Sequence, residues 1–524
     1  MTEDLSLRDV RLQKLERMRE LGHDPFRIER FDRTHTAKQM LDEFEEGKKI
    51  KFAGRVHSYR LMGKAGFAHV SDGDDKIQCY VRMDQVGDTA WELFKLLDIG
   101  DHVGVSGYLF VTKTGEKSIH VEEYVPLTKS LQPLPLGKEK DGHVFYGLAD
   151  VDLRYRHRHL DLICNQEVRR TLINRMKITS AVRRFLDRRG YLEVETPILQ
   201  LVAGGAMATP FVTKYKAYDL DVKLRISLEL YLKRIICGDI PKVYEIGRVF
   251  RNEGVDNRHN PEFTLLEFYE AYINLEEVMV IVEEMFKSVA LEVFGDTKVS
   301  VAVDPNEEVA DRSKHDEEAK GEPVVLDFGK PWHRLDLMSA LEERAGVTRE
   351  ELSEYESAKK AMERVGLPTE KENNLGGIIE KLLEKFVEPT LIEPTFLVGY
   401  PIETSPLAKK DPNNPKMTRR FEGYVRGREV CNAFSEINDP IDQRERFVQQ
   451  MAQRESGNDE AHPLDEEFLF ALEGGMPPTG GCGIGIDRMA MMLTGASHLR
   501  EVLLFPTMKP TKPGEETATE GAEA

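Results

Sequence analysis

The sequence has few cysteines, little tryptophan and no long apolar run. Five of its 524 residues are cysteine, and they are scattered singly with no CxxC pair. This spacing argues against a disulfide framework and against a zinc site. No apolar stretch approaches the length that spans a bilayer, and residues 1–4 lack the basic and apolar regions of a signal peptide. We therefore expect a cytoplasmic protein with no membrane segment.

Positive charge is also in short supply. The formal net charge is -19 at pH 7, which by itself speaks against a nucleic-acid partner. The acidity is uneven, because part of it lies in a Glu/Asp-rich stretch at 304–322 and part in the tail at 511–524. We expect that tail to be disordered, since it is poor in apolar residues. Basic residues gather near the N-terminus and between 154 and 189, either as patches for a polyanion or as ordinary solvated helix faces.

A chain of this length predicts two or three domains. Apolar residues at helical spacing predict an amphipathic helix in the lead-in at 1–48. Five short alternating runs at 49–137, closed by a proline-rich linker, are typical of a small oligonucleotide-binding β-barrel. Between 150 and 510 antiparallel strands stand between helices without regular βαβ alternation, which predicts an α+β domain. We place a helical insertion at about 335–395 within it.

A hairpin around residues 243–269 carries the first chemical signal. Apolar strand patterns flank a polar loop at 254–261. By strand parity Arg251 and Glu253 share one face, as do Phe263, Glu267 and Tyr269. Buried ions are costly unless they are paired with each other or with a ligand, so this face predicts a binding site. The alternative is a surface hairpin with solvated charges.

The segment 421–436 carries the second signal. Asn432, Phe434 and Glu436 share a strand face, which suits a ligand with an apolar stem and a cationic end. Glu422 and Glu429 are hard oxygen ligands, and two carboxylates near a polyphosphate commonly hold Mg²⁺. Paired glutamates are also common on solvated surfaces, so that alternative stays open.

A glycine string at 480–485 that leads to Arg488 carries the third signal. Its glycines allow a ligand to approach the backbone, and Arg488 falls on the first turn of the following helix. The string is not a P-loop and not a good dinucleotide fingerprint. The alternative, a tight packing turn between strand and helix, would have no use for Arg488 in the core.

Together the segments 193–197, 250–253 and 483–488 resemble the three ordered signatures of class II aminoacyl-tRNA synthetases. Residues 228–233, 259–264 and 432–436 narrow the resemblance to lysyl-tRNA synthetases of the bacterial type. It covers about residues 5–510, nearly the whole chain. The resemblance implies an antiparallel-sheet catalytic domain behind an OB-fold barrel. It also implies ATP-dependent ligation of L-lysine to tRNA(Lys) through lysyl-adenylate.

The resemblance further implies roles for individual residues. Arg251 and Arg488 would be catalytic, as ligands of the α- and γ-phosphates, and Mg²⁺ would be held by Glu422 and Glu429. The other ATP contacts would be Glu253 to the adenine amino group, His259 to the outer phosphates and Phe263 stacked on adenine. The lysine contacts would be Gly205 and Glu229 to the α-ammonium, Asn432 to the carboxylate, Phe434 along the stem, and Glu436 with Tyr269 at the ε-ammonium, with Glu267 lining the site.

In the barrel, Arg60, Phe67 and Gln78 match residues that grip the anticodon, where an aromatic ring would stack on a splayed base. Their alternative interpretation is one packing ring and two exposed polar residues. A homodimer is implied by the resemblance around Pro197. The chain departs from the family at three places: Ser227 and Leu228 replace Ala-Pro, Thr209 replaces an arginine, and Ala433 replaces a glycine.

Three rival functions are weighed against this one. A synthetase for aspartate or asparagine would need a cation where this chain has Glu436. A non-catalytic tRNA-binding relative would be suggested by loss of Arg251 or Arg488, and both are present. Relatives that ligate lysine to a protein lack the N-terminal barrel. The lysyl-tRNA synthetase prediction is therefore preferred.

Overall fold

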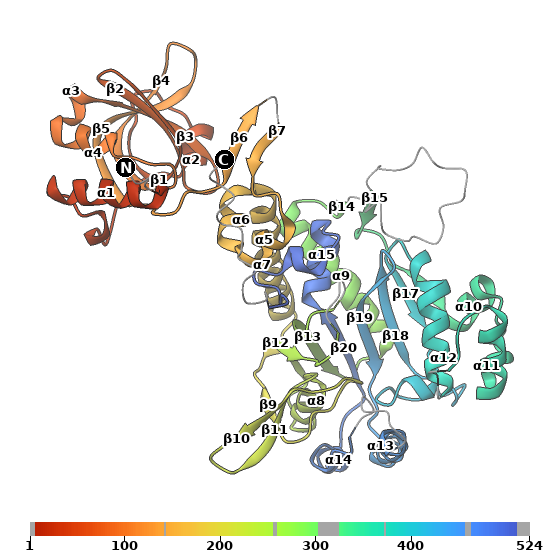
Figure 1. The fold of residues 1–524 in the computed structure, drawn as a ribbon. Coiled ribbons are helices and arrows are strands. Elements are labelled where there is room, and N and C mark those ends of the chain that lie inside the picture. The colour runs from red at the N-terminus through yellow and green to blue at the C-terminus, as the bar shows by residue number, and fades with distance from the viewer. Residues whose placement is uncertain are drawn as a thin grey trace. The chain divides into compact units, whose positions relative to one another are not determined.

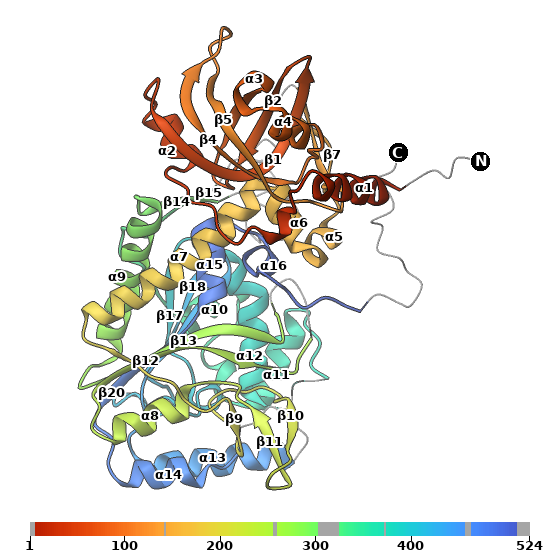
Figure 2. The ribbon, with the colours of Figure 1, turned by 90° about the vertical axis from the view of Figure 1, so that its left-hand side faces the viewer.

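The computed structural model describes residues 6–140, 143–254, 259–301, 324–370, 372, 374–455 and 463–510. The acidic stretch predicted at 304–322 lies outside the described residues, and so does the tail at 511–524. The described chain folds as two compact units, of which the first ends at Gln166 and the second spans Glu167–Pro510. Figures 1 and 2 show the elements of both units in two views.

A closed five-stranded barrel forms the centre of the first unit (Figure 1). Its strand order is β1-β2-β3-β5-β4, and inward-facing side chains such as Phe52, Val70 and Leu109 are fully buried. Alternation of buried and outward-facing residues is the pattern that a small barrel requires. The strands are β1 (Lys49–Met62), β2 (Ala65–Ser71), β3 (Lys76–Arg82), β4 (His102–Val111) and β5 (Lys117–Thr128). This confirms the predicted oligonucleotide-binding barrel.

The described part of the first unit also contains six α-helices and a hairpin. Helices α1 and α2 precede the barrel strands, α3 and α4 lie between β3 and β4, and the hairpin, α5 and α6 follow β5. The predicted N-terminal helix is present, capped by the Ser6 side chain, with Leu15 and Met18 buried. The hairpin is not predicted by the sequence pattern, because residues 131–137 have the composition of a linker and the strand after them is rich in charge. The helices are α1 (Leu7–Glu20), α2 (Ala37–Asp42), α3 (Met83–Val86), α4 (Asp88–Lys95), α5 (Val151–Arg156) and α6 (Arg158–Cys164), and the hairpin joins β6 (Leu136–Lys140) to β7 (His143–Gly147).

An eight-stranded sheet forms the framework of the second unit. Its central strands pair antiparallel, and the two edge strands β16 and β8 pair parallel to their neighbours. In order across the sheet the strands are β16 (His333–Asp336), β17 (Thr395–Val398), β18 (Arg420–Val425), β19 (Arg428–Ser435), β20 (Thr479–Gly485), β13 (Glu262–Ala271), β12 (Lys242–Phe250) and β8 (Leu192–Glu193). This confirms the predicted α+β class.

The two faces of the sheet differ in what they contact. Leu266 and Phe268 of β13 belong to a large core with three helices, α7 (Gln166–Arg188), α9 (Leu275–Phe294) and α15 (Ile486–Thr494). Glu267 and Tyr269 alternate with them along β13 and line a cavity. Because successive strand side chains point to opposite faces, one face is packed on helices and the other holds polar groups.

The remaining elements surround this sheet. A small sheet contains β9 (Leu199–Gln200), β10 (Val212–Tyr215) and β11 (Leu220–Leu224), and a further pair joins β14 (Lys298–Val301) to β15 (Val324–Asp327). The helices are α8 (Glu229–Cys237), α10 (Leu337–Ala345), α11 (Tyr355–Arg364), α12 (Leu375–Leu382), α13 (Pro440–Glu455), α14 (Glu466–Glu473) and α16 (Leu499–Val502). Helices α10 to α12 share a separate apolar core. Within the described ranges, no helix is long and apolar enough to cross a membrane.

Two predicted strands are shorter than expected. From the sequence pattern we also expect a strand at 191–199. The structure has only the short β8 and β9 there, on either side of Pro197, a residue that cannot donate to a strand ladder. The strand expected at 242–253 ends at Phe250. The parity argument for Arg251 and Glu253 was therefore wrong, since both lie in coil.

Candidate active site

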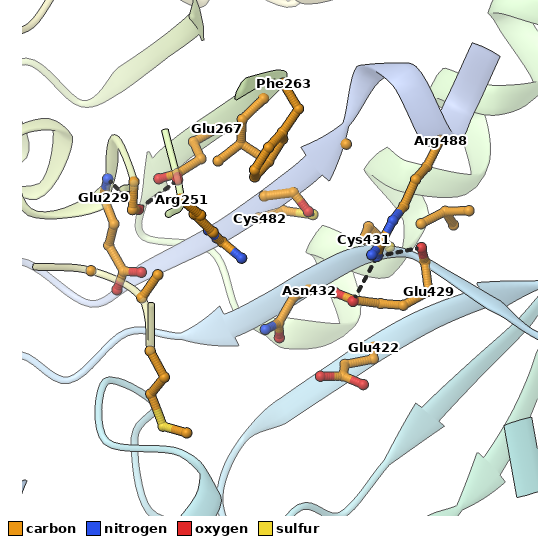
Figure 3. Close-up of a pocket in the computed structure, with 18 of the residues that line it drawn as sticks. Glu229, Arg251, Phe263, Glu267, Glu422, Glu429, Cys431, Asn432, Cys482 and Arg488 are labelled. Atoms are coloured by element: carbon orange, nitrogen blue, oxygen red, sulfur yellow. Dashed lines mark hydrogen bonds and ion pairs between the residues drawn. The ribbon is translucent and has the colours of Figure 1, made fainter. Parts of the chain in front are cut away.

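A cavity of about 730 Å³ opens on the polar face of the sheet (Figure 3). Strands β13, β18, β19 and β20, the coil after β12 and the start of α8 contribute to its lining, so segments far apart in sequence meet there. All residues predicted for ATP, lysine and metal binding line it: Gly205, Glu229, Arg251, Glu253, His259, Phe263, Glu267, Tyr269, Glu422, Glu429, Asn432, Phe434, Glu436 and Arg488.

Arg251 extends into the cavity from the coil directly after β12. Its backbone N–H donates to the Pro261 carbonyl at 2.8 Å, and its Nε donates to the Ile226 carbonyl at 3.4 Å. The guanidinium carbon lies 5.1 Å from the ring centre of Phe263, a cation–π distance. Burial lowers the pKa of Arg251, and Glu253 and Glu429 act against that change. An arginine remains cationic under these conditions, so the cavity has a fixed positive charge at this point.

Arg488 lies on the first turn of α15 and contacts the neighbouring strand. Its Nη1 donates to the backbone carbonyl and to Oε2 of Glu429, both at 2.9 Å (Figure 3). The adjacent Asp487 is buried and accepts from Arg175 Nη2 at 2.6 Å and from the Thr264 backbone N–H at 3.0 Å. Asp487 therefore anchors the start of α15 to β13 and fixes where Arg488 emerges. Sequence reasoning did not find Arg175, which comes from α7.

The glycine string is a strand and not the packing turn of the alternative interpretation. Residues 479–485 form β20 in the middle of the sheet, and α15 begins directly after it. Gly481 pairs with Tyr269 on one side and with Phe434 on the other. A Cβ at Gly481 would collide with the Glu436 carboxylate and the Tyr269 ring. Glycine is needed there because a side chain would occupy the space of the Glu436 carboxylate.

Where α8 meets the cavity, three carboxylates lie close to one ammonium group. The carboxylates are those of Glu229, Glu267 and Glu436, and the ammonium is that of Lys233. Lys233 is completely buried, and its Nζ contacts Glu229 Oε1 at 2.5 Å and also Glu436 Oε2. Burial raises the pKa of Glu436 to about 8, and Lys233 acts against that rise. Burial also raises the pKa of Glu229, again opposed by Lys233. Oε1 of Glu436 is buried and has no hydrogen-bond partner among the described residues.

Glu267 lies beside this group and accepts three hydrogen bonds. It accepts from the Ser227 hydroxyl at 2.8 Å, the Leu228 backbone N–H at 3.1 Å and the Tyr269 hydroxyl at 3.0 Å. Burial raises its pKa to about 7. The resemblance grouped Tyr269 with Glu436, whereas here the Tyr269 hydroxyl donates to Glu267. Ser227, one of the departures from the family, thus contacts a pocket carboxylate directly.

Asn432 and Phe434 share a partner that sequence reasoning missed. Arg420 of β18 donates from Nε to Asn432 Oδ1 at 3.2 Å. Its guanidinium carbon lies 4.5 Å from the ring centre of Tyr400 and 5.7 Å from that of Phe434. Arg420 could have been suspected from its position two residues before Glu422, but its register opposite Phe434 is a property of the sheet.

The two predicted metal ligands lie on neighbouring strands of one hairpin. Glu422 accepts from Arg420 Nη2 at 2.5 Å, Tyr424 at 2.6 Å and Tyr400 at 2.8 Å, and Glu429 pairs with Arg488. No group of three or more His, Cys, Asp or Glu placed to hold a metal occurs among the described residues. Their hard oxygen atoms fit Mg²⁺ only if phosphate oxygens and water complete the coordination.

The predicted anticodon residues lie on the outer face of the barrel in the first unit. The Arg60 guanidinium lies 4.8 Å from the half-buried Phe67 ring, which stacks on Tyr80 at 4.8 Å. Gln78 is buried, donates to Glu116 at 2.7 Å and accepts from the Ser118 hydroxyl at 3.1 Å. Phe67 and Arg60 therefore provide an aromatic ring and a cation side by side. Gln78 is already hydrogen-bonded within the barrel, so it is not the exposed polar residue of the alternative interpretation.

An OB-fold barrel together with an antiparallel sheet that carries this arginine- and carboxylate-lined cavity defines a class II aminoacyl-tRNA synthetase. The family model described as "tRNA synthetases class II (D, K and N)" matches residues 150–509, and the one described as "OB-fold nucleic acid binding domain" matches residues 50–127.

Relatives of nearly equal length narrow the class. A lysine–tRNA ligase of Thermoanaerobacter sp. (strain X514) is 48% identical over 512 residues, which is 97% of each chain. The lysine–tRNA ligase of Clostridium novyi (strain NT) is 48% identical over 507 residues, 96% of this chain and 94% of that one. The chain belongs to the lysine–tRNA ligase family.

Proposed function

We propose that this enzyme attaches L-lysine to tRNA(Lys) in two steps, with lysyl-adenylate as the intermediate, and so supplies translation. The observation that carries the choice of amino acid is Glu436, a buried carboxylate that lines the cavity and has one oxygen, Oε1, with no hydrogen-bond partner in the described part of the chain. A buried anion without a full set of partners attracts a cationic group. The Phe434 ring on the same strand face would lie along the apolar stem of lysine.

We propose that adenylate formation depends on positioning and on fixed charge. The lysine carboxylate, held by the Asn432 amide, would attack the α-phosphorus in line and displace pyrophosphate. Arg251 would stabilise charge that develops on the α-phosphate, and Arg488 would hold the γ-phosphate. No residue needs to act as a covalent nucleophile, and the tRNA ribose hydroxyl would take the acyl group in the second step.

We assign the remaining substrate contacts from the positions of the other residues that line the cavity. Phe263 would stack on the adenine ring on the side not covered by Arg251, with Glu253 at the adenine amino group and His259 at the outer phosphates. Glu229 and the Gly205 backbone would receive the α-ammonium of lysine. Mg²⁺ would be held by Glu422 and Glu429 with phosphate oxygens, where it would neutralise phosphate charge.

We propose that the barrel binds the anticodon through Phe67 and Arg60. A half-exposed ring beside a guanidinium suits a splayed base and its phosphate. Gln78 would take part only after exchanging its bonds to Glu116 and Ser118, so we place it as a support of the RNA-binding face.

A homodimer is proposed for the second unit. Leu192, Ile198, Leu199 and Leu201 surround Pro197 and are 57%, 44%, 52% and 64% exposed, a concentration of apolar surface that favours burial against a second copy. Light scattering on the purified protein tests it. The proposed location is the cytoplasm, where tRNA, ATP and lysine are available together.

Amino-acid-dependent exchange of pyrophosphate into ATP, run separately with each of the twenty amino acids, tests the proposed function. Lysine alone should support rapid exchange, and the same protein should then charge tRNA(Lys). Exchange that depends on aspartate or asparagine, or none with any amino acid, would contradict the proposal.

A further inference from the structure

Lys233 is the buried cation of the amino-acid pocket and has no place in the reaction described so far. It lies on α8 one turn after Glu229, and its side chain is 0% exposed. It is absent from the described residues that line the cavity. The ammonium therefore lies behind the carboxylates, where it contacts protein and not substrate.

The two partners of Lys233 are the carboxylates proposed to receive the two ammonium groups of the substrate. Nζ lies 2.5 Å from Glu229 Oε1 and also contacts Glu436 Oε2. Glu229 is on α8 and Glu436 directly follows β19, so a single nitrogen ties a helix to the end of a strand. Each carboxylate keeps its second oxygen for another partner, and for Glu436 that oxygen is buried and without a hydrogen bond among the described residues.

The local charge balance makes such a cation necessary. Glu229, Glu267 and Glu436 are all at most 5% exposed. Buried carboxylates without a counter-ion take up protons and lose their charge. The charged and titratable groups that face them among the described residues are Lys233 on α8, Arg251 after β12, Tyr269 on β13, Arg420 on β18 and Cys482 on β20. Of the three cations among them, only Lys233 contacts Glu436.

We infer that Lys233 is a positioning residue for lysine selection: its ammonium holds Glu229 and Glu436 at a fixed spacing and in the ionised form that the two substrate ammonium groups require. The inference rests on the proposed function, because it assigns Lys233 to the recognition of lysine. A purely structural ion pair would stabilise the fold without changing how the enzyme responds to lysine or to pH.

The test compares Lys233→Met, which keeps the length of the side chain and removes its charge, with the parent enzyme. Lysine-dependent pyrophosphate exchange is measured at several pH values. At neutral pH, Lys233→Met should raise the KM for lysine about tenfold or more, because one unit of pKa corresponds to a factor of ten. The KM for ATP should change little, and the pH at which lysine binding becomes strong should move upward by about one unit or more.

Two further variants sharpen the result. Lys233→Arg retains the charge and should restore the parental pH profile, even if its KM is altered. Lys242→Met removes a lysine that pairs with Glu270 at 2.5 Å outside the pocket and should leave both the KM for lysine and the pH profile unchanged. If Lys233→Met does not fold, Lys233→Gln, which is polar but uncharged, decides in the same assay.

The outcomes separate the two proposals. A folded Lys233→Met or Lys233→Gln enzyme with a KM for lysine equal to or below that of the parent, and with the parental pH profile, overturns the role of Lys233. A parent enzyme without lysine-dependent exchange overturns the proposed function instead. Thermal unfolding of each variant shows whether a lower activity reflects loss of the fold.

Discussion

Arg420 Nε donates to Asn432 Oδ1 at 3.2 Å. With its oxygen held by the guanidinium, the Asn432 amide keeps its NH₂ group as a hydrogen-bond donor. Both residues line the cavity. Under the proposed function this donor would receive the lysine carboxylate, so the Arg420 contact would determine which end of the amide meets the substrate.

Asn432→Asp should weaken lysine binding while leaving the fold intact. The new carboxylate would still accept from Arg420, but it would face the lysine carboxylate with an oxygen and a negative charge. Loss of a hydrogen bond to a charged group costs about 1.5–3 kcal/mol, so kcat/KM for lysine should fall about tenfold to a hundredfold. Cadaverine, which is lysine without the carboxylate, should inhibit the variant at least as well as the parent. Equal weakening of both ligands would contradict the assignment of Asn432 to the carboxylate.

Lysine affinity should rise with pH. The pKa of Glu436 is raised from its ordinary value of 4.5 to about 8, so its ionised fraction grows as the pH approaches and passes 8. The folded state keeps a proton that the unfolded chain has released, so this group costs stability as the pH rises from 4.5 to about 8. Bound lysine should remove that cost, and the stabilisation it gives in thermal unfolding should grow over the same range. Glu436→Gln should reduce the pH dependence, with the remainder due to Glu229 and Glu267, whose pKa values are also raised. A flat profile in the parent enzyme would contradict the prediction.

Phe67→Ala should weaken tRNA charging and spare the first reaction step. Removing one stacked ring costs about 1–3 kcal/mol per base, so the KM for tRNA should rise several-fold to about a hundredfold. Lysine-dependent pyrophosphate exchange without tRNA should remain at the parental rate. Phe26→Ala removes another ring of the same unit, 51% exposed, and should change neither activity. Loss of both activities in folded Phe67→Ala protein would argue against separate tasks for the two units.

Arg251→Lys should slow adenylate formation much more than it weakens ATP binding. Lysine keeps the charge but lacks the planar two-pronged geometry that can hold phosphate and carboxylate oxygens together. Removal of one preorganised donor costs about 3 kcal/mol, or roughly a hundredfold in rate. Single-turnover formation of lysyl-adenylate at saturating ATP and lysine measures this step. Arg248→Lys, an exposed position near the end of β12, is the matched control, and a similar rate for both variants would contradict a role for Arg251 in adenylate formation.

The barrel, the α+β class and the family could all be predicted from the sequence. Short alternating runs define barrel strands because their side chains face either a small core or solvent, and this is a local property. The order of the polar segments along the chain was sufficient to predict the family, because each segment contains charged residues that an apolar core would not contain. The roles of single residues in the site remain predictions, although every one predicted for ATP, lysine and metal lines one cavity.

Other features depended on which strands become neighbours. Periodicity gave no sign that Arg420 would meet Asn432, that Gly481 would make room for Glu436, or that Tyr269 would donate to Glu267. The spacing of Glu229 and Lys233 places them one helical turn apart, but the sequence does not show that Glu436 completes the pair.

The sequence by itself determined the class of fold and the residues that carry charge into the site. The tertiary structure decided which charges are paired with one another and which remain for a ligand. The physical reason is that local patterns fix the face on which a side chain lies, whereas ion pairs in a buried site depend on strand order, register and the space left by glycine. In this protein those long-range factors place the Lys233 ammonium between two carboxylates and leave Oε1 of Glu436 buried, with no hydrogen-bond partner among the described residues.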